Sequence, residues 1–291
     1  MTRSTLRTAF AAALGLVVAA SAPGTARSEL TLPRISPNTK VSQSIGLTDF
    51  TLTYSRPGVK GRKIWGELVP YGEVWRTGAN EATTFECSDA VTINGKTLPA
   101  GTYTFYTLPT AGEWDVIFSH AKGAWGSNEY TPEKDALRLK VKPQDAPHQE
   151  WMTIGFENLS PASGDLVVRW EKMAISVPVQ VNTNEKAMAN IRAALAERKS
   201  DDWQTLHRSA QYCFNAGINT DEAMAWEEQS VATKETYANL SLLADMKMKA
   251  GNAKEAIATA EKALKVGAAD PDKPNLKPTE KKLSEWKGKK G

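Results

Sequence analysis

The hydrophobic periodicity of this 291-residue chain changes once, at Asn182. Before that point, apolar residues alternate over short runs that Gly, Pro, Asn and Asp interrupt, and this pattern is typical of β-strands joined by turns. After it, apolar residues recur at helical spacing, with Ala187, Ile191, Ala194 and Leu195 on one helical face. We therefore expect a β domain followed by an α-helical domain, with few mixed α/β features.

Residues 41–182 carry the strand signals. Asn94-Gly95 stands between two β-prone runs and predicts a tight hairpin, because both residues tolerate positive φ. Apolar residues alternate from Met173 to Val181, and Pro178, which cannot donate to a ladder, predicts an edge strand there. Further strands are expected at Thr51–Tyr54, Thr83–Cys87, Thr102–Leu108, Trp114–Phe118, Leu137–Val141, Trp151–Phe156 and Leu166–Trp170. About ten short strands with frequent turns favour an all-β sandwich or a jelly-roll-like domain.

Residues 183–267 predict a small helical domain with an internal repeat. Asn184 is a plausible N-cap, and breaks are expected near Lys199–Asp202, Gly217–Asn219, Thr233–Glu235 and Gly251. Gly217 and Gly251 lie 34 residues apart, and each precedes an alanine-rich helical run. This period resembles the tetratricopeptide repeat (TPR), so we expect a TPR-like domain. Residues 268–291 are rich in Lys and Pro and predict a frayed tail, in which Thr279–Trp286 alone has helical character.

The N-terminus has the features of a secretory signal peptide. Arg3 and Arg7 precede an apolar run from Ala9 to Ala20, and small residues follow. The run is too short to span a bilayer, which takes about 20 residues. We therefore expect residues 1–26 to be a signal peptide, residues 27–40 a lead-in segment, and the protein to be exported to the periplasm or secreted, without a transmembrane segment. A structural N-terminal helix is the alternative.

Charge and composition argue against several classes of ligand. Removal of residues 1–26 would lower the formal net charge from +3 to +1, which gives no electrostatic reason to expect nucleic acid. The two cysteines, Cys87 and Cys213, fall in different predicted domains and are expected to be buried thiols rather than a disulfide. The three histidines are widely spaced, so no metal-ligand set is recognisable and no cofactor is expected.

The segment from Tyr54 to Glu81 is the best candidate for a binding site. It is a long connection punctuated by Gly and Pro, rich in aromatic and charged residues, and such connections often carry binding residues. Aromatic faces with Arg and Asn side chains suit a small polar ligand or a glycan. The predicted ligand-binding residues are Tyr54, Arg56, Trp65, Trp75, Arg76 and Asn80. The alternative is structural: the tryptophans would cap the core, and Arg56 and Arg76 would pair with Glu67 or Glu73.

Catalysis has weaker support in the sequence. A glycosidase needs two carboxylates about 5–10 Å apart, and the spacing of Glu67, Glu73, Glu81 and Glu86 does not imply such a pair. His120 follows a strand and is a possible acid or base, but a lone histidine there is more often a hydrogen-bonded loop residue. No catalytic residue is assigned.

Three motif runs resemble one known family. They are GEVWRTGAN at Gly72–Asn80, LPAGTYTFY at Leu98–Tyr106 and WDVIF at Trp114–Phe118. Together they are similar to the DUF2911 family of exported bacterial proteins, whose members often carry a helical, TPR-like extension. The likeness covers about residues 35–182 and implies the β domain and the exported location, but it implies no site residues because the family's function is unknown.

Three hypotheses follow. The first is a non-enzymatic binding protein with a small polar ligand or glycan on the β domain and a protein partner on the helical repeats. The second is a hydrolase of cell-envelope carbohydrate that uses loop carboxylates. The third is an interaction scaffold in which the aromatic segment is packing alone.

Overall fold

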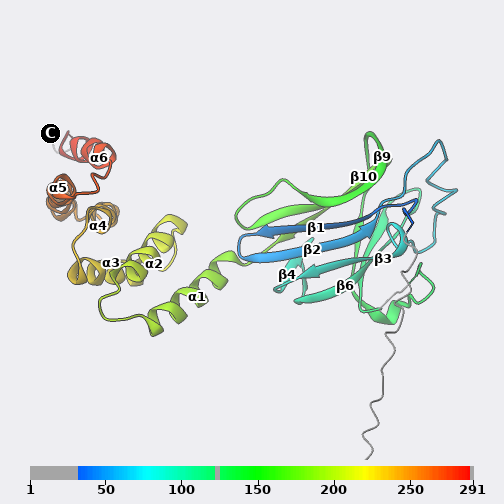
Figure 1. The fold of residues 1–291 in the computed structure, drawn as a ribbon, viewed down its shortest axis with the longest axis horizontal. Helices are drawn as coiled ribbons and strands as arrows, with labels where there is room; N and C mark the ends of the chain where they lie inside the picture. The colour runs from blue at the N-terminus through cyan, green and yellow to red at the C-terminus, as the bar shows by residue number, and fades with distance from the viewer. Residues whose placement is uncertain (1–31, 122–124, 289–291) are drawn as a thin grey trace, which may run out of the picture. The chain divides into compact units, whose positions relative to one another are not determined.

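The computed structural model describes residues 32–121 and 125–288 (Figure 1). Ten strands lie between Asn38 and Gln180, and six helices follow from Thr183 to Gly288. The chain is therefore an antiparallel β-sheet domain followed by helices, as the change of periodicity at Asn182 predicts. The predicted signal peptide, residues 1–26, lies outside the described residues, as does the first part of the lead-in segment.

The larger sheet has six antiparallel strands in the order β1-β2-β3-β6-β7-β8. Their bounds are β1 Asn38–Ile45, β2 Thr48–Ser55, β3 Ala79–Cys87, β6 Gly101–Leu108, β7 Trp114–Ser119 and β8 Asp135–Val141, with a short 3-10 helix, η1, at Pro132–Lys134. The connection from β2 to β3 holds the aromatic segment that the sequence singles out. It pairs with β6 through two backbone hydrogen bonds between Trp75 and Thr107, of 2.7 and 3.0 Å.

The smaller sheet has four strands in the order β5-β4-β10-β9. Their bounds are β4 Val91–Ile93, β5 Lys96–Leu98, β9 Gln144–Glu157 and β10 Ser163–Gln180. The β4–β5 hairpin turns at Asn94 and Gly95, whose φ angles are 47° and 79°, so the predicted hairpin is confirmed.

One apolar core is shared by both sheets. Phe85, Phe105 and Trp114 come from the larger sheet, and Ile154 and Trp170 from the smaller sheet, and all are buried in the same cluster. These residues alternate along their strands with residues of the opposite face, since successive side chains in a strand point to opposite faces.

Two details of the predicted strands are wrong. β1 begins at Asn38, inside the predicted lead-in. The predicted edge strand around Pro178 is part of β10, which lies between β4 and β9 in the sheet. Pro178 is tolerated because it lies outside both ladders: the pairs of β10 with β9 end at Ala174, and those with β4 begin at Val179. Its carbonyl accepts a 2.8 Å hydrogen bond from Asn94 N at the hairpin turn.

The helices are α1 Thr183–Glu197, α2 Trp203–Ala216, α3 Thr220–Thr233, α4 Tyr237–Lys249, α5 Ala253–Ala269 and α6 Lys277–Gly288. The gaps between the first five coincide with the four predicted breaks. Gly217 ends α2 with φ of 69°, a left-handed conformation that glycine adopts without steric cost. The N-cap of α1 is Asn182, whose side chain accepts a hydrogen bond from Glu185 N, and not the predicted Asn184.

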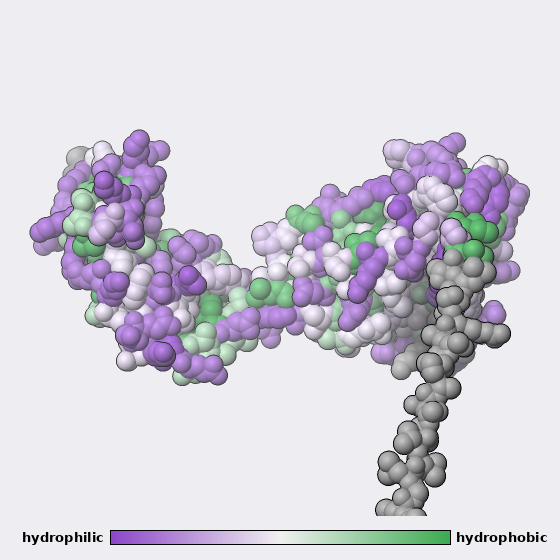
Figure 2. All heavy atoms as spheres, viewed as in Figure 1, coloured by the Kyte–Doolittle hydropathy of each residue, from purple (hydrophilic) through white to green (hydrophobic). Residues whose placement is uncertain are grey.

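Two small clusters hold the helices together. Ala210, Cys213, Ala223 and Met246 are buried in one, and Ala244, Ala260 and Leu283 in the other. Leu283 belongs to α6, so the predicted frayed tail contains a packed helix that is longer than Thr279–Trp286. On the face shown in Figure 2, hydrophilic residues cover most of the helical part. Within the described residues, every helix is too short or too polar to cross a bilayer.

Candidate functional site

Three of the predicted ligand-binding residues make structural contacts. The Tyr54 hydroxyl donates to Ile154 O at 3.0 Å and accepts from Ile154 N at 2.9 Å. Arg56 Nε donates to Met152 O at 2.8 Å. These three bonds connect Tyr54 in β2 and Arg56, the residue after β2, to β9 in the smaller sheet, so the two side chains tie the two sheets together. Asn80, at φ of 57°, donates from Nδ2 to Ser36 O at 3.2 Å.

Trp65 and Trp75 pack against the shared core. The Trp65 ring centroid lies 4.7 Å from that of Trp114 and 5.9 Å from those of Trp75 and Trp170. Trp75 stacks on Trp170 at 5.6 Å, and its indole N–H donates to Gly78 O at 3.1 Å. Their rings therefore contact other indoles.

The sixth residue, Arg76, lies on the other face of the same strand-like segment. Trp75 forms an antiparallel bridge with Thr107, so the next position along, Arg76, stands opposite Tyr106. The register continues from Tyr106 to Ile117 on β7 and from Ile117 to Arg138 on β8. These four side chains form one cross-strand row, which we call the outer row, on the face of the larger sheet that points away from the shared core.

Two polar groups of the outer row have no hydrogen-bond partner among the described residues. Tyr106 is fully buried, and its hydroxyl makes no hydrogen bond within the described part of the chain. Arg76 Nε is also buried without an acceptor there. Burial lowers the pKa of Arg76, and burial raises the pKa of Tyr106, with the Glu129 carboxylate adding to the rise.

Residues 126–130, between β7 and β8, cover the middle of the row, and we call them the covering segment. The Tyr130 ring meets the Tyr106 ring edge-on, with centroids 5.3 Å apart. Gly126 approaches the guanidinium so closely that a Cβ on this residue would lie 3.6 Å from Arg76 Nη1. Residues 126 and 130 thus place backbone and ring against the two unpartnered groups.

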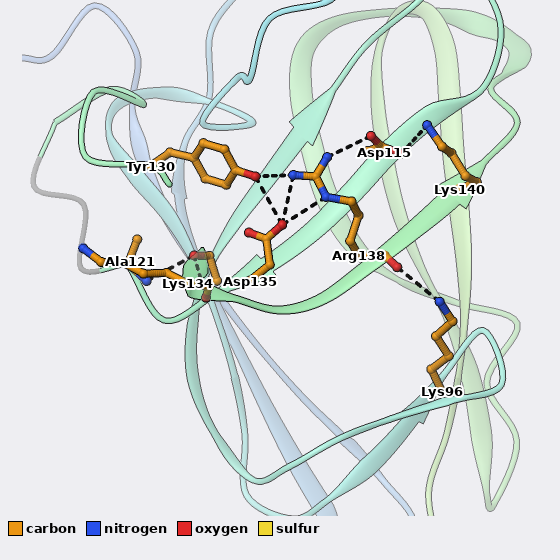
Figure 3. Close-up of polar contacts among 9 residues, drawn as sticks. Lys96, Asp115, Ala121, Tyr130, Lys134, Asp135, Arg138 and Lys140 are labelled. Carbon is orange, nitrogen blue, oxygen red and sulfur yellow. Dashed lines mark hydrogen bonds and ion pairs between the residues drawn. The ribbon is translucent and has the colours of Figure 1, made fainter. Parts of the chain in front are cut away.

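Arg138, at the far end of the row, is fully engaged (Figure 3). Its Nη1 donates to Asp115 Oδ2 at 2.9 Å and its Nε to Asp135 Oδ2 at 3.0 Å, while Nη2 also contacts the Tyr130 hydroxyl. Lys140 Nζ pairs with Asp115 Oδ1 at 2.7 Å. Two cations thus face two carboxylates, and the charge of this cluster is balanced.

Two of the remaining sequence candidates, Glu67 and His120, make separate contacts. Glu67 pairs with Lys63 at 3.0 Å on the surface. The ring of the exposed His120 lies 5.2 Å from that of Tyr103, and the backbone N–H of His120 donates to Lys134 O. No group of three or more His, Cys, Asp or Glu residues within the described ranges has the arrangement of a metal site. Cys87 and Cys213 are free and buried, as predicted.

Comparison with known proteins identifies the β domain. The family described as "Protein of unknown function (DUF2911)" matches residues 36–179. This part of the chain belongs to the DUF2911 family. The match runs from two residues before β1 to the penultimate residue of β10, so the outer row lies within the DUF2911 domain and the six helices lie outside it. No curated protein and no solved structure matches the chain.

Sequence reasoning found Arg76 but missed its neighbours Tyr106, Tyr130, Asp115 and Arg138. Two signals point to them. Tyr106 is a large aromatic residue on the face of its strand that Thr104 also occupies, opposite to the core face of Tyr103 and Phe105. Asp115 is a carboxylate inside the otherwise apolar run of β7, and it is 6% exposed. A buried acid in such a strand requires a cationic partner.

Proposed function

We propose that this protein is a non-enzymatic binding protein whose DUF2911 domain holds a small polar ligand between Arg76 and Tyr106. One observation carries the proposal: a fully buried hydroxyl without a hydrogen bond stands beside a partly buried guanidinium without an ion pair in the described chain. More than about nine in ten buried polar groups in native proteins are paired. Since an unpaired one costs about 1–3 kcal/mol, a ligand that supplies acceptors would recover that free energy on binding.

The proposal narrows the site expected from the sequence. Backbone carbonyls accept hydrogen bonds from the Tyr54 hydroxyl, Arg56 Nε and Asn80 Nδ2. The rings of Trp65 and Trp75 contact other tryptophans. Of the six predicted residues, Arg76 therefore remains as the ligand-binding one, joined by Tyr106. A glycan that needs an aromatic stacking platform fits this arrangement less well than a compact polar molecule.

The wider features of the protein follow as part of the same proposal. Two antiparallel sheets around one core support a β-sandwich, and the paired helices α2–α3 and α4–α5, separated by Gly217 and Gly251, support a TPR-like domain. The basic and apolar N-terminal sequence supports export to the periplasm or beyond.

A protein partner on the helices is part of this proposal. A cavity of about 600 Å³ there is lined by Phe214, Met224, Met246 and Lys249, among others. Its mixed apolar and charged lining supports contact with a partner, but nothing in its chemistry selects one.

The ligand site is tested by thermal unfolding of the full chain against a panel of amino acids, hydroxy acids, sugars and sugar acids. A ligand at a hundredfold excess over its dissociation constant stabilises the native state by about 2.7 kcal/mol. We expect a shift in melting temperature that is lost in Arg76→Gln and kept in Arg169→Gln, since Arg169 pairs with Glu157 on the surface. A shift that survives Arg76→Gln would place the ligand elsewhere, and no shift with any compound would count against a ligand site.

A further inference from the structure

The charges around the outer row are unequal at its two ends. At one end, Arg138 and Lys140 are matched by Asp115 and Asp135. At the other end, Arg76 has no carboxylate partner in the described chain, and burial lowers its pKa without an opposing charge. The Arg76 guanidinium therefore lacks a contacting counter-ion among the described residues, in surroundings where the cost of an unpaired ion is high.

We infer that the ligand is recognised through a single carboxylate group, which pairs with the Arg76 guanidinium and accepts a hydrogen bond from the Tyr106 hydroxyl. The inference rests on the proposed function and names the chemical class of its ligand. The expected ligands are small monocarboxylic acids, such as hydroxy acids, acyl amino acids and sugar acids.

Geometry supports a planar anion. A guanidinium presents its N–H groups in a rigid, flat fork that matches both oxygens of a carboxylate. Arg76 and Tyr106 are opposite each other across an antiparallel pair, where Cβ atoms lie about 4.5–5.5 Å apart, so both donors can reach one group. Neither donor has a competing acceptor on β6, on β7 or in the described part of the covering segment.

The charges around the site favour a ligand with one negative charge over a ligand with two. Arg76 is the one cation of the outer row without a contacting carboxylate in the described chain, because Arg138 at the other end is already paired with Asp115 and Asp135. Burial raises the pKa of Tyr106, and the carboxylate of Glu129, an exposed residue of the covering segment, adds to that rise. A phosphate monoester carries about two negative charges at neutral pH and would therefore be repelled by Glu129 more than a carboxylate would be.

The test follows the side-chain Nε–H resonance of Arg76 by heteronuclear NMR of the isotope-labelled full chain. The resonance is assigned by its absence in Arg76→Gln. Lactate, N-acetylglycine and glucuronate are titrated beside their neutral counterparts propane-1,2-diol, N-acetylglycinamide and glucose, with glucose 6-phosphate as the phosphate probe. We expect a saturable shift with at least one carboxylate and no shift with its neutral counterpart.

Variants separate the two donors. Tyr106→Phe is expected to weaken carboxylate binding about tenfold, as the loss of a hydrogen bond to a charged group does. Arg76→Lys keeps the charge but loses the fork, so its affinity is expected to fall between those of the wild type and Arg76→Gln. Arg169→Gln is the matched surface control, and its affinity is expected to equal that of the wild type.

The possible failures have different meanings. If a neutral compound shifts the resonance as much as its acid, the ligand site stands and the carboxylate inference is wrong. Tighter binding of glucose 6-phosphate than of glucuronate overturns the choice of a single charge. If no compound shifts the resonance, both the inference and the proposed ligand site are rejected.

Discussion

Replacement of Tyr106 by phenylalanine is expected to stabilise the ligand-free protein. The change keeps the ring and its edge-on contact with Tyr130, and it removes only a hydroxyl that is fully buried without a partner. Burial of an unsatisfied hydroxyl costs about 1–3 kcal/mol. We therefore expect the free energy of unfolding to rise by about 1 kcal/mol, the low end of that range. For a domain near 150 residues this corresponds to a rise of about 2–4 °C in melting temperature.

Tyr54→Phe is the matched control. Tyr54 is also a buried tyrosine of the larger sheet, but its hydroxyl makes two hydrogen bonds with the backbone of Ile154. Its removal leaves a buried N–H and a buried C=O without that partner. We therefore expect a loss of about 1–3 kcal/mol. The two variants lose the same atom from the same residue type, yet their stability changes should have opposite signs.

The assay is urea unfolding of the full chain, followed by tryptophan fluorescence, since six of the nine tryptophans lie in the β domain, and by far-ultraviolet circular dichroism, to which the helices contribute most. Only the transition of the β domain should move in either variant. If Tyr106→Phe destabilises that transition as much as Tyr54→Phe does, the Tyr106 hydroxyl has a partner in solution, such as a bound water. The argument for a ligand site from an unpartnered hydroxyl would then fail.

Three further predictions concern other parts of the molecule. Both thiols should label slowly in the native protein near pH 8, about the pKa of an ordinary thiol, because burial raises the pKa of Cys87 to about 11 and also raises the pKa of Cys213. Two equivalents should label at once in denaturant, and fast native labelling would contradict the burial of the thiols. Glu227 is fully buried, with His207 Nδ1 2.8 Å from Oε1, and burial raises its pKa despite that contact. A raised carboxyl pKa means that stability is lost as pH rises through the folded-state pKa. Glu227→Gln should therefore raise the free energy of unfolding of the helices at neutral pH, and this gain should shrink as pH falls toward the ordinary glutamate pKa of 4.5. A gain that is independent of pH would contradict this reasoning. Trp75→Ala should lower the free energy of unfolding by up to about 3–5 kcal/mol, because it removes an aromatic ring from a packed cluster. Trp125→Ala, at a position 64% exposed, should change it by less than about 0.5 kcal/mol. Equal losses in urea unfolding would show that Trp75 does not stabilise the protein through the tryptophan cluster.

The strands and helices that the sequence predicts best are those with local signals. The hairpin at Asn94-Gly95 and the helix ends at Gly217 and Gly251 each depend on residues with positive φ, which the sequence names directly. β1 lacks such a signal, because its residues alternate between exposed and half-buried and its position depends on eight pairs with β2. β10 reads as two strands because its register shifts around Glu171, a non-glycine residue at φ of 56°, and this irregularity hides the continuity of the strand.

The candidate site was only partly predictable for a related reason. The composition of the Tyr54–Glu81 segment points to a binding site, but composition cannot say which face of the segment each residue occupies. The bridge between Trp75 and Thr107 decides that question, since it turns the indole toward Trp170 and the guanidinium toward Tyr106. Thr107 lies 32 positions along the chain, so no local pattern reports the bridge.

The contrast between the two arginines of the outer row makes Arg76 informative. Arg138 shows that this sheet can place acids beside a guanidinium, because Asp115 and Asp135 both pair with it. A purely structural residue at position 76 would need no charge, since apolar residues often replace buried ions without loss of stability. An arginine at position 76 without a carboxylate partner in the described chain, beside a tyrosine whose hydroxyl is also unpaired there, therefore favours a partner from outside the chain. If that reasoning holds, Arg76→Met should raise the stability of the ligand-free protein and abolish carboxylate binding in the same variant.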